Sequence, residues 1–290
     1  MPKNLALIVC GILLAGCGAA VARDPTPLLN AHAHNDYQHA RPLYEALDNG
    51  FCSIEADIVL VNSELIVAHD RKHVVAGRTL TSLYLDPLRQ RVAANGGRVY
   101  RNGPTVILLI DFKSDWKTTY PKLCDVLQRY AGMLTVWRGD RQVVGAITVV
   151  MTGGHPPPSV LLAEPIRYAA LDGKLADVDS SVSVAVMPQI AIDWKSLFDW
   201  TGVGTMPHDE REALDKLVAR VHTHGRTLRL WGAPDTLCGW RTLLDAGVDY
   251  INTDDLAGLR RFLLAQAKSP ASQPCTRKTP AGSPRDPESK

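Results

Sequence analysis

The stretch CSIEADIVL at residues 52–60 and the stretch TVILLI at residues 105–110 decide the fold class. Both are almost continuous apolar runs, which is typical of strands buried on both faces of a parallel sheet. Segments with helical apolar spacing, such as 211–224 and 237–246, separate most of the apolar runs. The other runs lie at residues 28–31, 146–151, 167–171, 182–186, 227–231 and 249–252. Eight strands alternating with helices predict a single-domain α/β fold, a TIM-like (β/α)8 barrel, rather than a doubly wound sheet.

Charged side chains interrupt or directly follow both stretches. Glu55 and Asp57 are two residues apart and therefore point to the same side of their strand, as do Asp111 and Lys113. Ionised carboxylates are costly to bury unless they are paired or bind a metal. Oxygen donors suit Mg²⁺ or Ca²⁺ better than zinc, which prefers nitrogen and sulfur. We therefore predict a divalent-metal site formed by Glu55, Asp57 and Asp111, with Lys113 neutralising an anionic phosphate.

Two histidines are expected at the same end of the barrel. His32 ends the first strand, and His69 follows a hairpin that turns at Asn62 and Ser63. Polar residues at the carboxyl ends of barrel strands face the active site. Each of these residues alone could be a surface or salt-bridged group, but the convergence of all six on neighbouring strand ends favours a catalytic site. One histidine would take a proton from the attacking hydroxyl, and the other would donate one to the leaving oxygen.

The order of these motifs resembles that of a known superfamily. His32, IEAD at 54–57, AHD at 68–70 and DFK at 111–113 are similar to the pattern of the glycerophosphodiester phosphodiesterase and phosphatidylinositol-specific phospholipase C superfamily. Further runs resemble more closely the subfamily typified by altered inheritance of mitochondria protein 6. These are HAHNDY at 32–37, RPL at 41–43, TLTSLYL at 79–85 and DPL at 86–88.

The resemblance implies a phosphodiesterase TIM barrel over residues 28–267. It also implies a metal-dependent phosphoric diester hydrolase that acts on a glycerophosphodiester or phospholipid-type substrate. The implied roles are catalysis for His32 and His69, metal binding for Glu55, Asp57 and Asp111, phosphate binding for Lys113, and an aromatic mouth residue at Trp231. The first strand ends in HAH where relatives have HRG, so the arginine that relatives place beside the phosphate is missing. We expect His34 or Asn35 to take its place in binding substrate.

Two other functions compete with this interpretation. The pair His32 and His34 is also the first-strand signature of amidohydrolase-type zinc enzymes. Those enzymes need further histidines at the ends of the fifth and sixth strands, and residues 171–172 and 187–189 offer none. A non-catalytic lipoprotein could keep the barrel as a ligand-binding shell, but both His32 and His69 are present. Tightly held zinc would favour the first alternative, and activity restored by Mg²⁺ or Ca²⁺ would favour the phosphodiesterase.

Residues 1–16 are expected to be a lipoprotein signal peptide. An apolar run over residues 5–15 and the sequence LAGC at 14–17 resemble a bacterial lipobox, which implies cleavage before Cys17 and lipidation of its thiol. Cleavage after Ala22 is the alternative. We therefore expect an exported protein, lipid-anchored to a bacterial outer membrane or else periplasmic or secreted, with residues 17–27 as a linker.

The tail at residues 268–290 is rich in Ser, Pro, Lys and Arg and poor in apolar residues, so we expect it to be disordered. A formal net charge of +2 and the lack of a lysine and arginine run argue against a nucleic-acid partner. We expect a monomer whose partners are a small-molecule or lipid phosphodiester and, through the lipid anchor, a membrane.

Overall fold

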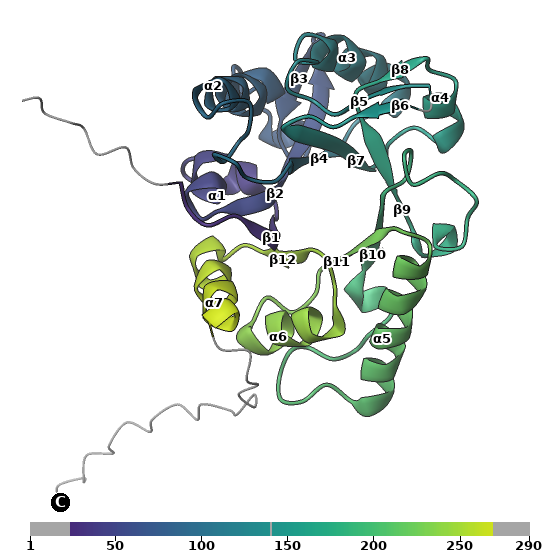
Figure 1. Cartoon of the computed structure of the whole chain (residues 1–290). Coiled ribbons are helices and arrows are strands. Elements are labelled where there is room, and N and C mark those ends of the chain that lie inside the picture. The colour runs from purple at the N-terminus through teal and green to yellow at the C-terminus, as the bar shows by residue number, and fades with distance from the viewer. Residues whose placement is uncertain (1–23, 140, 269–290) are drawn as a thin grey trace, which may run out of the picture.

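A nearly closed ring of parallel strands forms the centre of the molecule (Figure 1). The computed structural model describes residues 24–139 and 141–268. Within them, eight strands follow the order β11-β10-β9-β7-β4-β2-β1-β12, and a parallel bridge between Arg229 and Tyr250 joins the two ends. The strands are β1 (Leu28–Ala33), β2 (Phe51–Val61), β4 (Val106–Phe112), β7 (Ile147–Gly153), β9 (Ala170–Gly173), β10 (Gln189–Asp193), β11 (Thr227–Trp231) and β12 (Ile251–Thr253). The prediction of a single-domain TIM-like barrel is confirmed.

The α-helices of the described chain lie outside this ring (Figure 1). They are α1 (Tyr44–Asp48), α2 (Asp86–Ala94), α3 (Trp116–Gln128), α4 (Pro158–Leu162), α5 (His208–Thr223), α6 (Leu237–Ala246) and α7 (Leu256–Lys268). The longer helices pack on the strands because one face of each is apolar. In α5 the buried positions recur at helical spacing: Leu214, Leu217, Val218 and Val221. The predicted helices at 211–224 and 237–246 therefore correspond to α5 and α6.

A short hairpin extends β2 beyond the ring. Strand β3 (Glu64–Val67) pairs antiparallel with the end of β2, with Val61 opposite Glu64. The two turn residues Asn62 and Ser63 have φ angles of 47° and 65°, as a two-residue hairpin turn with the strand twist requires. The hairpin is confirmed, and it returns the chain to Asp57 and Ile58 of β2 directly before His69.

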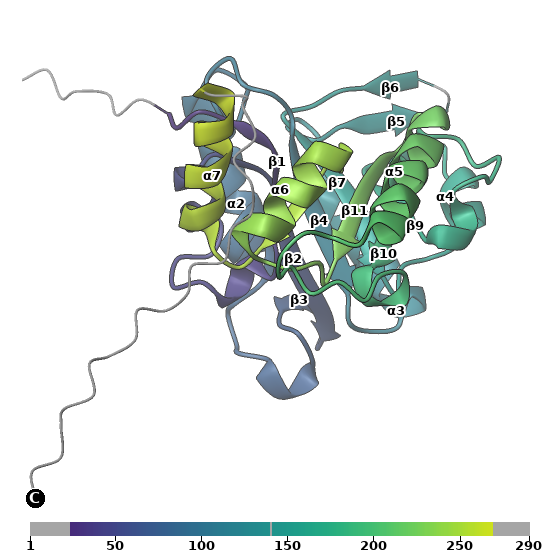
Figure 2. The ribbon, with the colours of Figure 1, turned by 90° about the horizontal axis from the view of Figure 1, so that it is seen from below.

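A second, smaller sheet lies at the other end of the barrel. It consists of β5 (Val136–Arg138), β6 (Arg141–Val143) and β8 (Ile166–Arg167) in antiparallel pairs. Figure 2 shows β5 and β6 at the end of the barrel opposite to β3.

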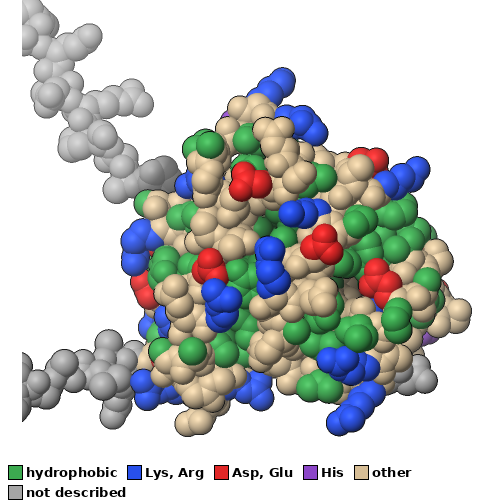
Figure 3. All heavy atoms as spheres, turned by 90° about the horizontal axis from the view of Figure 1, so that it is seen from above, with side chains coloured by type: hydrophobic (Ala, Val, Ile, Leu, Met, Phe, Trp, Pro, Cys, Tyr) green, Lys and Arg blue, Asp and Glu red, His purple; other side chains and the backbone are tan. Residues whose placement is uncertain are grey.

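On the molecular face in Figure 3, basic and acidic side chains are interspersed, and neither sign of charge forms a continuous patch.

The sixth strand was expected at residues 182–186, and that expectation is wrong. Residues 183–187 form turns, in which the Ser183 carbonyl accepts hydrogen bonds from the amides of Val186 and Met187. Val184 is 45% exposed. The barrel strand is β10, which begins one residue after Pro188. The fifth strand also begins later than expected, because β9 starts at Ala170 and Arg167 belongs to β8. A short apolar run contains too few residues for its periodicity to determine where a strand begins and ends.

Three expectations lie outside the described residues. They are the signal peptide at 1–16, the lipidation of Cys17 and the disordered tail at 268–290. Only the first residue of that tail, Lys268, lies in the described chain, and it ends α7 instead of being disordered. Within the described chain, no helix combines the length and the apolar character needed to span a bilayer.

Candidate active site

The carboxyl ends of the barrel strands surround a cavity of about 720 Å³. Its walls include most of the side chains that the sequence singled out: His34, Asn35, Glu55, His69, Asp111, Lys113 and Trp231. His32 and Asp57 are fully buried next to these walls. The structure therefore brings together the residues predicted from strand ends that are far apart in the sequence.

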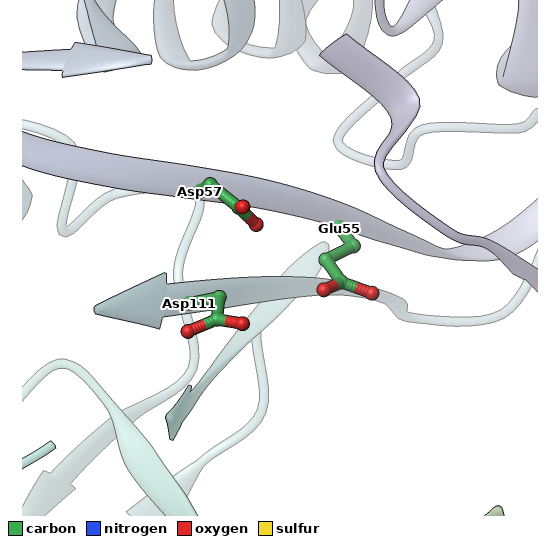
Figure 4. Close-up of side chains that lie close together, drawn as sticks. All are labelled: Glu55, Asp57 and Asp111. Carbon is green, nitrogen blue, oxygen red and sulfur yellow. The ribbon is translucent and has the colours of Figure 1, made fainter. Parts of the chain in front are cut away.

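Glu55, Asp57 and Asp111 form an acidic cluster (Figure 4). Strands β2 and β4 are parallel and in register, with Asp57 directly opposite Asp111. Glu55 lies two residues earlier on the same side of β2, so all three carboxylates project toward one point. One oxygen from each lies within 4.8 Å of the others. This register explains why a pair in one strand and a single acid in the next converge.

Lys113 offsets part of this negative charge. Its Nζ lies 2.8 Å from Asp111 Oδ2 and 3.3 Å from Asp57 Oδ2. Burial, together with the nearby Glu55, raises the pKa of Asp57 to about 6. The other oxygen of this residue, Asp57 Oδ1, is buried without a hydrogen-bond partner among the described residues. A set of oxygen donors with one unpartnered carboxylate oxygen fits a hard divalent cation such as Mg²⁺ or Ca²⁺.

His32 lies on one side of the acidic cluster. Its ring is fully buried, with Nδ1 2.7 Å from Ser53 Oγ and Nε2 2.9 Å from Glu55 Oε2. Burial lowers the pKa of His32 to about 4, although the hydrogen bond with Glu55 opposes this shift. Burial alone would raise the pKa of Glu55, but Arg229 and His32 hold it well below its usual range. Glu55 is therefore an anion held by two neighbours.

His69 lies on the other side of the cluster. It follows the β3 hairpin, and its Nδ1 is 3.0 Å from Asp57 Oδ2. Its side chain is 56% exposed, in contrast to the enclosed ring of His32. The hydroxyl of Tyr37 is 2.8 Å from Asp57 Oδ2 and 3.4 Å from His69 Nδ1. The two histidines thus contact different members of the cluster, one from the interior and one from the rim.

The remaining predicted substrate residues lie around the mouth. His34 Nδ1 is 2.9 Å from Asp254 Oδ1, so this ring turns toward the loop after β12. Asn35 adopts a left-handed backbone with φ 46° and contacts the other nitrogen of His34 at 3.1 Å. Trp231 ends β11, across the ring from β4, and 43% of its surface is exposed (Figure 1). Their proximity to the cavity agrees with the prediction, and their roles in binding substrate stay predictions.

Two residues of the site were missed from the sequence. Arg229 in the middle of β11 places Nη1 3.0 Å from Glu55 Oε2 and 3.2 Å from His32 Nε2. Tyr37 appeared only as part of a family motif, without a role. A signal for Arg229 was available, because it is a charged residue inside an apolar strand run, as Glu55 is. The rule that identified Glu55 applies to it equally.

The zinc alternative lacks its donors in the described chain. The potential metal cluster there contains three carboxylates and no imidazole. His34 contacts Asp254. The fifth and sixth barrel strands, β9 and β10, contribute Asp172 and Asp193 to the cavity, where the zinc site would need histidines.

Comparison with known proteins places the chain in a family. The model of the AIM6-like phosphodiesterase domain matches residues 19–172. The chain belongs to the AIM6-like phosphodiesterase family. A second model, of the glycerophosphoryl diester phosphodiesterase family, matches residues 227–257. The active-site strands β1, β2 and β4 lie in the first match and β11 in the second.

Curated relatives of this AIM6-like domain include fungal proteins. It is 30% identical to altered inheritance of mitochondria protein 6 of Eremothecium gossypii, over 88% of this chain and 76% of that protein. It is 31% identical to the homolog in Arthroderma benhamiae, over 83% of this chain and 86% of the other. A glycerophosphodiester phosphodiesterase structure from Parabacteroides distasonis superposes with a TM-score of 0.50 at 15% identity, covering 84% of this chain and 99% of that one. That structure supports the barrel fold. Together the family matches make the chain a phosphodiesterase-family domain.

These relatives also correct the expected location. We expected a lipid-anchored protein of a bacterial outer membrane. The curated relatives are fungal proteins, and eukaryotic cells have no bacterial outer membrane. That location is therefore contradicted.

Proposed function

We propose that this AIM6-like domain is a metal-dependent phosphoric diester hydrolase in which His32 and His69 act as acid and base. Its substrate would be a glycerophosphodiester or a phospholipid-type diester. One observation carries the proposal: the cluster of Glu55, Asp57 and Asp111 opens into the cavity with one histidine on each of two sides.

The phosphate would lie over the acidic cluster. A divalent ion bound there would offset two of the three negative charges of the carboxylates and would polarise the phosphoryl oxygens. Lys113, which contacts both Asp111 and Asp57, would place a further positive charge beside the phosphate. The negative charge of a phosphate is spread over its oxygen atoms. Fixed positive charges on two sides of the phosphate would therefore stabilise it, and they would stabilise the charge that develops during the reaction.

The two histidines would carry the proton transfers. Displacement at phosphorus requires a base near the entering oxygen and an acid near the leaving oxygen. His32 at Glu55 and His69 at Asp57 approach the cluster from different sides, as these two roles require. A substrate with a neighbouring hydroxyl, as in glycerol or inositol, would attack its own phosphate and give a cyclic product. Otherwise water would attack.

The substrate class rests on the second family match and on the cavity. The match over residues 227–257 is to glycerophosphoryl diester phosphodiesterases, and it includes Trp231. A cavity of about 720 Å³ with an exposed tryptophan at its mouth has room for a polar headgroup and an apolar contact. A panel of glycerophosphodiesters, lysophospholipids and phosphoinositides would identify the substrate.

The proposal is tested by His69→Ala and Glu55→Ala in the hydrolysis of bis-(p-nitrophenyl) phosphate and of glycerophosphodiesters. Loss of a proton-transfer group lowers rates by about 10²–10⁴-fold, which applies to His69→Ala. Glu55→Ala would remove one of the three carboxylates of the proposed metal site, so we expect both variants to be inactive in routine assays. The matched controls are His73→Ala, an exposed histidine paired with Asp70, and Glu64→Ala on the exposed start of β3. Both controls should keep wild-type rates. Near wild-type activity of either site variant would refute the assignment.

A further inference from the structure

Arg229 is a buried cation on the wall of the active-site cavity. Its side chain is 4% exposed, yet it is one of the residues that line the cavity. It projects from β11 and reaches Glu55 on β2, from which it is separated by 174 positions in the sequence. The guanidinium therefore enters the site from the side of the ring opposite to β4 and Lys113.

Its hydrogen-bonding capacity is only partly used. Among the described residues, Nη1 donates a hydrogen bond to Glu55 Oε2 and lies 3.2 Å from His32 Nε2, a nitrogen that also contacts Glu55, while Nε is buried without a partner. A guanidinium has five N–H donors in a planar fork, which matches two oxygens of a carboxylate or phosphate. A buried cation with unused donors beside an open cavity is suited to an anionic ligand.

The charges of the site lead to the same conclusion. The three carboxylates carry three negative charges if all are ionised, and a divalent ion supplies two positive charges. Lys113 alone would bring the loaded site to neutrality, whereas Lys113 and Arg229 together leave one positive charge. This count covers the acidic cluster and the two cations that contact it, and the same cavity is also lined by Asp172, Asp193 and Lys174. A phosphodiester carries one negative charge. Arg229 therefore supplies the positive charge that the cluster, once loaded and paired with Lys113, would lack for a phosphodiester.

The two cations approach the acidic cluster from different sides. Lys113 contacts Asp111 and Asp57, whereas Arg229 contacts Glu55. A phosphate seated over the cluster would therefore have an ammonium on one side and a guanidinium on the other.

We propose that Arg229 is a substrate-binding residue whose guanidinium holds a non-bridging oxygen of the phosphodiester opposite Lys113. This inference rests on the proposed function, because it assigns a further residue to the same site. It adds a guanidinium contact to those predicted for His34 and Asn35, whose roles stay predictions. It also makes Arg229 more than a counter-ion of Glu55.

The test measures anion binding and metal binding separately on the full chain. The variants are Arg229→Gln and Arg229→Lys, and the control is Arg220→Gln, which removes one positive charge from a surface ion pair with Asp179. Ca²⁺ binding is measured by calorimetry. Binding of dimethyl phosphate, a diester with one negative charge, is then measured by ³¹P NMR in the Ca²⁺-loaded protein.

We expect Arg229→Gln to weaken dimethyl phosphate binding by about tenfold or more, the effect of losing a charge-assisted contact. Ca²⁺ should bind this variant at least as tightly as it binds the wild type. The loss of the positive Arg229 side chain beside Glu55 removes its repulsion of the Ca²⁺ ion. Arg229→Lys should bind the anion with intermediate affinity, and Arg220→Gln should match wild type. If Arg229→Gln does not fold, Arg229→Lys alone decides, because wild-type anion affinity in it would contradict a role for the planar fork.

Three results would overturn the proposal, two of them in the variant and one in the wild type. The first is unchanged anion binding in folded Arg229→Gln. The second is a parallel loss of Ca²⁺ and anion binding, which would make Arg229 only a support for Glu55. The third is a wild-type protein that binds no dimethyl phosphate. Failure of the proposed function is distinct: the wild type would then bind dimethyl phosphate with dependence on Arg229 but hydrolyse no diester.

Discussion

Asp57 is the residue on which the contacts of the site converge. Its Oδ2 is approached by the hydroxyl of Tyr37, by His69 and by Lys113, and its carboxyl group is fully buried. Oδ1 has no partner within the described chain. An unsatisfied buried acceptor is costly, and this supports the proposed metal site at the carboxylate of Asp57.

Tyr37→Phe tests how this carboxylate is held. The substitution keeps the packing of a ring that is 7% exposed and removes the hydroxyl near Asp57 and His69. Loss of a group that orients a metal ligand typically lowers metal affinity or activity by about 10–100-fold. We expect such a decrease in Ca²⁺ affinity and in kcat/KM. Tyr44→Phe, at a tyrosine that is 46% exposed, is the control. If Tyr37→Phe has the same Ca²⁺ affinity and kcat/KM as Tyr44→Phe, Tyr37 does not position the carboxylate.

Asp36 makes the stability of the fold depend on pH. Its carboxyl is buried and accepts hydrogen bonds from the Leu43 amide and the Tyr84 hydroxyl. Burial raises its pKa to about 6, although both hydrogen bonds oppose the shift. The folded state then binds this proton more tightly than the unfolded state, so stability decreases as the pH rises from about 4 to about 6.

Asp36→Asn should remove this contribution, because the amide stays neutral and can still accept both hydrogen bonds. At about 1.4 kcal/mol per pKa unit, the variant should gain about 3 kcal/mol relative to wild type between pH 4 and pH 7. Urea unfolding at several pH values measures this difference. Parallel pH profiles for the two proteins would contradict the expectation.

At the scale of elements, the pairing of β2, β4 and β7 sets the metal site. Asp57 lies opposite Asp111, and Phe112 lies opposite Gly153 at the end of β7. Gly153 has a φ of 71°, and a Cβ there would overlap Asp111 Oδ1. The end of β7 thus leaves the space that the Asp111 carboxylate occupies, which explains a glycine at this position.

Gly153→Ala should therefore displace Asp111 and weaken the metal site. We expect at least a tenfold lower Ca²⁺ affinity with a smaller effect on overall secondary structure, measured by calorimetry and circular dichroism. Gly154→Ala is the matched control, since its added Cβ would meet only the Phe112 carbonyl at 3.4 Å, an ordinary contact. If both variants bind Ca²⁺ as wild type does, the space beside Gly153 is not needed for the site.

At the scale of the whole molecule, a bound divalent ion should stabilise the barrel. A ligand that binds only the folded state at about 100 times its Kd contributes about 2.7 kcal/mol, which corresponds to a Tm increase of about 5–10 °C for a domain of this size. We expect Mg²⁺ or Ca²⁺ to raise Tm after treatment with EDTA. The shift should vanish in Asp111→Asn and persist in Asp215→Asn, which changes an exposed ion pair on α5. A shift with zinc alone would favour the amidohydrolase alternative instead.

The sequence by itself determined the barrel and most of the site. Acids inside apolar strands are visible in a sequence because burial of a charge requires a partner, and this identified Glu55, Asp57 and Asp111. The hairpin was equally visible, because Asn62 and Ser63 form a polar pair between two apolar runs. Local features of this kind predicted an acidic, metal-binding type of site, whereas the phosphodiesterase class rests on the family resemblance and the family match.

Only the tertiary structure decided which partners these groups have. The contact of Arg229 with Glu55 and His32 exists because strands far apart in the sequence lie around one ring, and local periodicity contains no information about such closure. The sixth strand was misplaced for a related reason: β10 is a five-residue strand whose burial comes from its neighbours β9 and β11. The sequence thus determined which groups would be costly to bury, and the closed barrel determined which groups meet them.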